Sequence, residues 1–315
     1  MIYLSCQPAI PRFTWEVEVY VNNFIDMGID PSDIHVVCGV DRNEKDIPED
    51  WQKLQNHYKD VNFFFYDDGR VSNPYQPSLQ AHILEKHWMA HPELEQEAVF
   101  FHDADFIFTK PFDFTPFLQD DIWYMSDTVS YIGANYIRSK GDEVFNAMMN
   151  IAGLDPSFVI EQELNSGGAQ KLMKNIPTEY WGLSYNMQMD LWREIPPISQ
   201  RIKKEKDEAG EAYMVLQHWT MSMWSELWMA WKLGRETRVP EEFNFHFAID
   251  HIDKWLDRSF FHNAGVTGPD QGIFFKGMFD SMLPYGYEIP NANENVTGWK
   301  YFQYIQEVGK KSCLI

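Results

Sequence analysis

The sequence predicts an α/β fold, with helices on both faces of a mostly parallel central sheet. Short apolar runs alternate with helix-like runs over the first third of the chain, and this alternation is typical of parallel strands joined by crossover helices. The chain has 315 residues, of which 44% are hydrophobic and 16% aromatic. That composition is enough for a large core, and the length suits one large domain or two small ones.

The predicted elements alternate up to residue 101. Strands are predicted at short apolar runs, and helices where apolar residues recur every three or four positions. The predicted strands are 1–6, 34–40, 61–66 and 98–101. The predicted helices are 13–27, 50–58 and 77–91. Because ligands bind at the carboxyl ends of parallel strands, polar residues near these ends should meet at one edge of the sheet. These residues are Ser5 to Pro8, Asp41, Asp67 to Arg70, Asp103 and Asp105.

The second half of the chain is predicted to elaborate the same domain, because the alternation weakens beyond Lys110. The expected strands are 122–126 and 130–134, and the expected helices are 142–152 and 221–233. The segment ELNSGGAQKLMKN is expected to be a Gly-rich turn that leads into a helix from about Ala169. The charged residues 200–210 predict a mobile segment, and the Gly and Pro of the last eighty residues predict loops.

Charge and cysteine content exclude several classes of protein. The formal net charge of −21 argues against a broad nucleic-acid-binding surface. The three cysteines, Cys6, Cys38 and Cys313, are far apart and form neither a disulfide framework nor a zinc motif. The N-terminus lacks a signal peptide, and no stretch approaches the ~20 apolar residues of a membrane span. We therefore expect a soluble, cytoplasmic protein without a membrane span.

The run VFFHDADFIFTKPFDF, Val99 to Phe114, sets two carboxylates inside an apolar segment. On a strand end, Asp103 and Asp105 would share one face, with the small Ala104 opposite. Two neighbouring carboxylates repel each other unless a cation lies between them or they lie at an opening. Because carboxylate oxygens are hard ligands, the pair predicts a Mg²⁺ or Mn²⁺ site. The alternative is a turn with two exposed aspartates.

Three strand–helix units followed by FFHDADFIF resemble the GT-A-fold, nucleotide-sugar-dependent glycosyltransferases, and in particular the retaining, glycosyltransferase-family-8-like members. The resemblance implies that Asp103 and Asp105 bind Mn²⁺ or Mg²⁺, which holds the diphosphate of a sugar donor, and that Asp103 also faces the sugar. It covers the first ~120 residues by architecture. It implies a nucleotide-sugar-binding half at 1–125 and a sugar- and acceptor-binding half at 126–315 of one GT-A domain.

Two later segments also resemble this family. Asn165-Ser166-Gly167-Gly168 is similar to the segment that lines the sugar pocket, which makes Asn165, Gly167 and Gly168 predicted sugar-binding residues. His262-Asn263-Ala264-Gly265 is similar to a C-terminal motif in which the histidine is a third metal ligand and the glycine, here Gly265, lies against phosphate. Such members carry a lysine where this chain has Gly268, and Lys276 is the candidate replacement. The alternatives are an ordinary helix-entry turn and a structural histidine.

The catalytic carboxylate has two candidates, Glu226 and Asp190. On the predicted helix 221–233, the stripe of Trp224, Trp228 and Trp231 is typical of a core face, and Glu226 lies on another face. Its position in the chain follows the order of the acidic residue in retaining members. Asp190, in NMQMDLW, is the competitor. For either residue, the alternative is a solvated carboxylate.

Further nucleotide contacts follow from the strand ends and from the helix before the aspartate pair. The predicted nucleotide-binding residues are Ser5, Gln7, Asp41, Asp68, Arg70, Gln80, Lys86 and Lys276.

The sequence thus predicts a metal-dependent glycosyltransferase that uses a nucleoside-diphosphate donor, a UDP-sugar being commonest among similar enzymes. Retention of configuration is expected, with inversion by a carboxylate base as the alternative. The acceptor is a glycan, a protein or a modified nucleobase, and the sequence does not indicate an oligomeric state. Two other functions are consistent with parts of the sequence. Asp103-Ala-Asp105 with Thr109 is similar to a haloacid-dehalogenase-type phosphatase motif, and the tryptophan content suits a non-enzymatic carbohydrate-binding protein.

Overall fold

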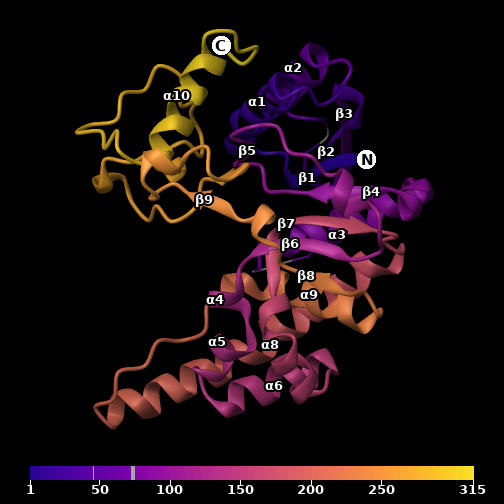
Figure 1. Cartoon of the computed structure of the whole chain (residues 1–315), viewed down its shortest axis with the longest axis vertical. Helices are drawn as coiled ribbons and strands as arrows, with labels where there is room; N and C mark the ends of the chain where they lie inside the picture. Colours follow the sequence, from indigo (N-terminus) through magenta and orange to yellow (C-terminus); the bar gives the residue numbers. More distant parts are fainter. Residues whose placement is uncertain (45, 72–74) are drawn as a thin grey trace. The chain divides into compact units, whose positions relative to one another are not determined.

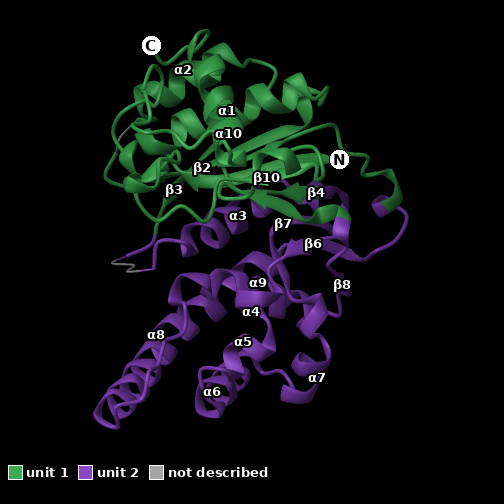
Figure 2. Cartoon of the chain, turned by 60° about the vertical axis from the view of Figure 1, so that its left-hand side comes forward, with its two compact units in different colours: residues 1–69, 99–116, 242–315 green, residues 70–98, 117–241 purple. Residues whose placement is uncertain are grey.

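We describe a computed structural model of the chain, which covers residues 1–44, 46–71 and 75–315 (Figure 1). The chain divides into two compact units, each assembled from separate stretches of sequence (Figure 2). Unit 1 comprises residues 1–69, 99–116 and 242–315, and unit 2 comprises residues 70–98 and 117–241. Neither unit is a continuous half of the chain, so the predicted functional division at residue 125 does not coincide with these units and stays a prediction.

Unit 1 is built on parallel strands in the order β3-β2-β1-β4. These strands are β1 (Ile2–Pro8), β2 (Ile34–Asp41), β3 (Asn62–Asp68) and β4 (Ala98–Phe101). The first residue of β4, Ala98, belongs to unit 2, and the rest of β4 belongs to unit 1. The helices of this unit are α1 (Pro11–Asp26), α2 (Glu49–His57) and α10 (Thr297–Gly309). Helix α1 packs against both α2 and α10, and the three lie together in the green unit of Figure 2. Strand β1 is buried along most of its length, as expected of a parallel strand covered on both faces.

A second, three-stranded sheet of unit 1 has the order β5-β10-β9. Its strands are β5 (Phe106–Phe108), β9 (Phe245–Phe247) and β10 (Phe260–His262). β10 runs antiparallel to β5 and parallel to β9. Asn23 of α1 ties this sheet to the helix, because its amide accepts a hydrogen bond from the Phe108 N–H at 2.7 Å and donates one to the Phe108 carbonyl at 3.0 Å.

Unit 2 combines strands with a helical layer. Its strands are β6 (Trp123–Asp127), β7 (Gly167–Lys174) and β8 (Thr237–Arg238), in the order β7-β6-β8. β6 is antiparallel to β7 and parallel to β8. The helices are α3 (Ser78–Ala90), α4 (Val129–Ile132), α5 (Ala134–Arg138), α6 (Asp142–Ala152), α7 (Pro156–Glu161), α8 (Glu179–Glu208) and α9 (Met221–Lys232). The long helix α8 packs against α3, α6 and α9.

Short 3₁₀ turns connect these elements. They are Pro31–Asp33, Pro92–Gln96, Thr115–Leu118, Glu163–Asn165, His218–Thr220, Glu241–Phe243, Ile252–Lys254, Pro269–Gln271 and Lys276–Met278. Among the residues that the structure covers, no helix is both long enough and apolar enough to cross a membrane.

The predicted fold class is confirmed. The main sheet has seven strands in the order β3-β2-β1-β4-β7-β6-β8, and its pairings are mostly parallel. In the first third, each predicted strand and helix is present within a few residues, and the strand at 98–101 has the predicted bounds. The helix predicted at 142–152 also has its predicted bounds.

Three predictions for the second half are wrong. Residues 130–134 are not a strand, because α4 and the start of α5 occupy them. The Gly-rich segment does not begin a helix at Ala169, since Gly167–Lys174 pairs with β6 as a strand. Residues 200–208 are the end of α8, where ion pairs at helical spacing such as Arg201–Glu205 and Lys203–Asp207 support the helix. The helix α10 was also not expected in the loop-rich C-terminal region.

Candidate active site

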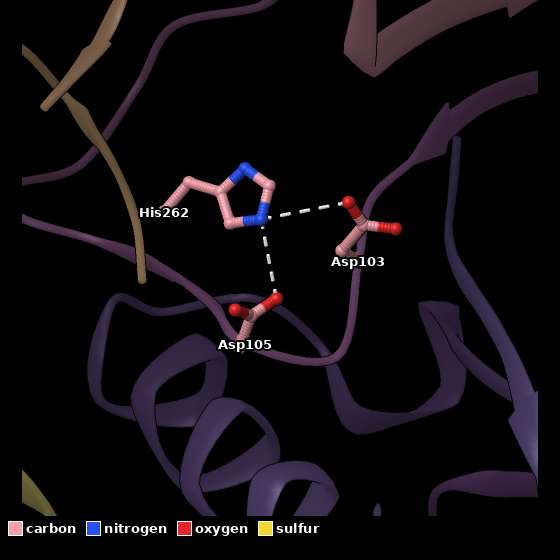
Figure 3. Close-up of side chains that lie close together, drawn as sticks. All are labelled: Asp103, Asp105 and His262. Atoms are coloured by element: carbon pink, nitrogen blue, oxygen red, sulfur yellow. Dashed lines mark ion pairs between the residues drawn. The ribbon is translucent and has the colours of Figure 1, made fainter. Parts of the chain in front are cut away.

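Asp103, Asp105 and His262 converge in unit 1 (Figure 3). The Nε2 atom of His262 lies 3.2 Å from Oδ1 of Asp105 and 3.6 Å from Oδ2 of Asp103. One ligand atom from each of the three residues lies within 4.8 Å of the others. The Asp105 side chain is 5% exposed and the Asp103 side chain is 36% exposed. The cluster is therefore closed on the Asp105 side and more open on the Asp103 side.

Strand pairing explains how residues far apart in sequence reach this cluster. The aspartates lie in the turn between β4 and β5, and His262 is the last residue of β10. The antiparallel pairing of β10 with β5 sets His262 opposite Phe106, directly after Asp105. The backbone N–H of Asn263 also donates to the Asp105 carbonyl at 3.1 Å. The second sheet therefore holds the histidine beside the aspartate pair.

The predicted geometry of the Asp pair was wrong in one respect. Strand alternation does not place the two side chains, because β4 ends at Phe101 and residues 102–105 form a turn. The alternative of two exposed aspartates is also wrong, because Asp105 is buried. The turn itself directs both carboxylates toward His262.

The carboxyl ends of the unit 1 strands meet at one edge, as the fold class predicts. Asp41 and Asp68 are register partners at the ends of β2 and β3, and Pro8 of β1 pairs with Gly39. The end of β4 pairs with Leu4, whose carbonyl then accepts a hydrogen bond from His102 N–H at 3.0 Å. The aspartate turn therefore begins beside the middle of β1.

Lys276 forms an ion pair with Oδ2 of Asp105, so the other carboxylate oxygen of Asp105 faces His262. Burial by itself raises the pKa of Asp105, but the charges of Lys276 and His262 outweigh it and hold that pKa well below its ordinary value. Burial lowers the pKa of His262, and the two aspartates reverse this and raise it. The opposite charges therefore compensate one another around the buried Asp105 carboxylate.

Glu16 of α1 is a buried acid beside this cluster, and the sequence analysis missed it. Burial, then the charge of Asp105, raises the pKa of Glu16 to about 7, although Lys276 and Arg12 oppose the rise. The guanidinium Nε of Arg12 lies 3.5 Å from a Glu16 oxygen. The sequence signal was weak, because a glutamate between apolar helix positions is usually assigned to the solvent face.

His102 is a core residue, although it precedes the aspartate pair. Its ring is fully buried and lies 4.8 Å from the ring of Tyr20 and 4.9 Å from that of Phe24, between ring centroids. Nδ1 lies 2.9 Å from the Asp103 carbonyl oxygen. Burial lowers the pKa of His102 to about 4, so the imidazole is neutral at pH 7 and fixes the start of the turn.

The three converging residues fit a divalent cation. Two carboxylate oxygens and one imidazole nitrogen suit Mn²⁺, and the carboxylates suit Mg²⁺. Ligand atoms at right angles around one such ion lie about 3 Å apart. The separations of 3.2 and 3.6 Å between His262 Nε2 and the two carboxylates are close to that value.

The other predicted residues of unit 1 differ in their surroundings. Ser5 lies in the middle of β1 rather than at its end, because the strand continues to Pro8. The Ser5 hydroxyl lies in the core, 2.7 Å from the Tyr20 hydroxyl. Its expected place at the edge is therefore wrong. Gln7 is buried and donates to the Val37 carbonyl at 3.1 Å.

Asp41 and Gly265 are exposed, and Asp68 is half-buried. Asp41 accepts hydrogen bonds from the backbone and side chain of Asn43, at 2.8 and 2.7 Å. Gly265 has a φ of +89°, which favours glycine. The nucleotide and phosphate roles of these residues stay predictions.

The predicted sugar-binding segment lies in unit 2. Gly167 is tightly enclosed, because an added Cβ would come within 2.4 Å of Met125 Cβ. An added Cβ on Gly168 would lie 2.6 Å from the flexible end of Met223 and 3.3 Å from Thr128 Oγ1. Asn165 is half-buried, and its amide donates to Gln162 Oε1 at 2.8 Å. The glycines therefore have a packing reason, and their sugar contacts stay predictions.

The two candidate carboxylates, both in unit 2, have different environments. Glu226 is buried on α9 and forms an ion pair with Lys171 of β7, so it is not a solvated carboxylate. The tryptophans Trp224 and Trp228 of the same helix are fully buried, as the stripe predicts. Asp190 forms a surface ion pair with Arg193 at 2.7 Å, and its side chain is 48% exposed. The catalytic role of either residue stays a prediction.

Three predicted nucleotide-binding residues also belong to unit 2. The Arg70 guanidinium donates to Ser78 Oγ at 2.9 Å and to the Gln76 carbonyl at 3.2 Å, which holds the chain at the start of α3. Gln80 and Lys86 are half-buried on α3. Their nucleotide contacts stay predictions.

Comparison with known proteins supports the fold. No protein-family model and no curated protein matches the chain. It is similar to a solved structure titled "WbbM bifunctional glycosytransferase apo structure", with 10% sequence identity and a TM-score of 0.50. The similarity covers 98% of this chain and 51% of that one, so the chain spans about half the length of the solved protein. At this identity, the similarity shows a shared fold.

Proposed function

We propose that the protein is a metal-dependent glycosyltransferase of the GT-A type, which transfers a sugar from a nucleoside diphosphate, with a UDP-sugar as the first candidate donor. The observation that carries this proposal is the convergence of Asp103, Asp105 and His262 after the carboxyl end of β4, a strand that is parallel to β1. Ligands of such sheets bind at that edge. The similarity in fold to a glycosyltransferase is consistent with the proposal.

Asp103, Asp105 and His262 would hold Mn²⁺ or Mg²⁺. A divalent ion bound there supplies positive charge to stabilise the departing diphosphate. Lys276 has two roles in the proposal. Its ammonium group compensates Oδ2 of Asp105, which leaves Oδ1 for the ion, and it offers a second positive charge to the anionic donor.

We propose retention of configuration, with Glu226 as the first candidate for the catalytic carboxylate and Asp190 as the second. Lys171 compensates the charge of the buried Glu226, so the carboxylate can remain inside the protein without an unpaired charge. Asp190 has a surface partner in Arg193, an arrangement that is common without function. Inversion, with one of these residues as general base, is the alternative.

Nucleotide binding tests the proposal directly. Isothermal titration of the wild type with UDP and GDP is carried out in Mn²⁺ and again in EDTA, together with assays of donor hydrolysis across UDP- and GDP-sugars. We expect a nucleoside diphosphate to bind in Mn²⁺ and its affinity to fall at least tenfold in EDTA. This fall corresponds to a loss of about 1.4 kcal/mol or more of binding free energy. Turnover of phosphate monoesters instead would favour the phosphatase.

Variants connect this result to the cluster. Asp105→Asn should abolish the Mn²⁺-dependent binding, but it also removes the buried partner of Lys276 and can impair folding. Asp103→Asn is the second variant, because Asp103 is more exposed. Asp60→Asn changes an exposed aspartate of the same unit and serves as the matched control. Equal metal-dependent binding by wild type, Asp103→Asn and Asp60→Asn would overturn the proposed site.

A further inference from the structure

Tyr131 and Trp219 of unit 2 form an aromatic pair at the protein surface. The residue Trp219 is 58% exposed, whereas Trp181, Trp224 and Trp228 of the same unit are fully buried. The ring centroids of Tyr131 and Trp219 are 6.2 Å apart, and the ring planes differ by 31°. The exposed indole leaves apolar area in contact with water, and a ligand that covers this area gains free energy by removing it from water.

Hydrogen bonds fix the turn that carries Trp219. The Tyr75 hydroxyl donates to the Trp219 carbonyl at 2.8 Å and accepts from the Ser222 N–H at 2.7 Å. The Tyr75 ring is itself stacked on Trp192, at 4.9 Å between centroids. Thr220 Oγ1 closes the turn by donating to the Gln217 carbonyl at 2.6 Å. A ligand that stacks on this indole would therefore not have to order the turn, which favours affinity.

The pair adjoins a strained β-bulge. Tyr131 N–H donates to the Thr128 carbonyl at 3.1 Å, and Thr128 Oγ1 donates to the Ser166 carbonyl at 3.1 Å. The register between β6 and β7 shifts between Met125, which pairs with Lys171, and Ser126, which pairs with Gly168. Ala169 lies in the part of β7 between these partners and has a φ of +55°. A non-glycine residue in the left-handed region is uncommon, and such strain and bulges cluster at binding sites.

We propose that Tyr131 and Trp219 form a stacking platform for a neutral pyranose ring of the acceptor. The role as an acceptor site rests on the proposed function, whereas sugar binding does not. Aromatic rings stack on the apolar C–H face of a pyranose, and nearby carboxylates accept hydrogen bonds from its hydroxyls. Asp127, the exposed last residue of β6, is such a carboxylate, and its Oδ1 accepts a hydrogen bond from the Val129 N–H at 3.0 Å at the entrance to α4. Its charge, in a chain with a formal net charge of −21, favours a neutral sugar over an anionic one.

Saturation-transfer NMR tests the platform without a known acceptor. The probes are the methyl pyranosides of glucose, galactose and mannose, with glucuronate as the anionic comparison, all without nucleotide. We expect at least one neutral pyranoside to bind the wild type more tightly than glucuronate. Trp219→Ala should weaken this binding about tenfold, and Trp219→Phe should keep much of it, because it retains a ring.

Met214→Ala is the matched control, because Met214 is another exposed apolar side chain of the same unit, at 79% exposure, and is not an aromatic ring. Absence of pyranoside binding to the wild type, or equal binding by wild type and Trp219→Ala, would overturn the platform. Titration of the same variants with UDP and Mn²⁺ separates the two proposals. Absence of metal-dependent binding of both UDP and GDP to the wild type, with intact pyranoside binding, would overturn the proposed transferase and leave the platform.

Discussion

Replacing Glu16 by glutamine should change how the stability of the protein depends on pH. Glutamine keeps the shape of the side chain and removes its titration. Burial, then the charge of Asp105, raises the pKa of Glu16 from 4.5 to about 7, with Lys276 and Arg12 opposing the rise. Each unit of difference between the folded and unfolded pKa is worth about 1.4 kcal/mol, so this difference changes the free energy of unfolding by about 3 kcal/mol.

The sign follows from proton binding. Between pH 4.5 and 7, folded Glu16 is protonated more than unfolded Glu16, so its contribution to stability is present below pH 4.5 and is lost as the pH rises toward 7. The loss is nearly complete at pH 8, above which the contribution of Glu16 no longer changes with pH. Glu16→Gln lacks this loss. We therefore expect the variant to gain up to about 3 kcal/mol relative to the wild type between pH 4 and pH 8.

Urea unfolding at pH 4, 5.5, 7 and 8, in EDTA to remove metal, measures the difference between the two proteins. Glu49→Gln is the control, because Glu49 lies on α2 with an 84% exposed side chain, and its profile should follow the wild type. A stability difference between Glu16→Gln and wild type that is the same at all four pH values would refute the reasoning. A variant that loses stability relative to the wild type as the pH rises would also refute it.

Two further predictions concern buried polar groups. Asn23→Ala removes both hydrogen bonds to the Phe108 backbone and leaves two buried groups unpaired. Urea unfolding should therefore show a loss of about 2–4 kcal/mol in the free energy of unfolding. The control Asn43→Ala, at an exposed position, should show little change. Lys171→Met leaves the buried Glu226 without its partner, so it should cost about 3–5 kcal/mol, and adding Glu226→Leu should recover part of that loss. A double variant less stable than Lys171→Met, or an Asn23→Ala variant as stable as Asn43→Ala, would contradict these accounts.

The sequence was most informative where hydrophobic pattern and local structure agree. The first four strands and the helices between them follow from apolar runs and helical spacing, because buried parallel strands require such runs. The prediction failed for Gly167–Lys174, which has the composition of a turn and becomes a strand by pairing with β6. It failed also for residues 200–208, where charge was taken as a sign of mobility and instead supplies ion pairs along α8.

The residues alone determined an α/β sheet, an aspartate pair after its fourth predicted strand, and a histidine in a motif that resembles a metal-binding one. Only the tertiary structure decided that β10 pairs with β5 and so sets His262 against both aspartates. It also decided that Lys276 and Glu16 join them. The physical reason is that strand pairing and burial act between residues far apart in the chain, whereas hydrophobic periodicity reports only on neighbours within one element.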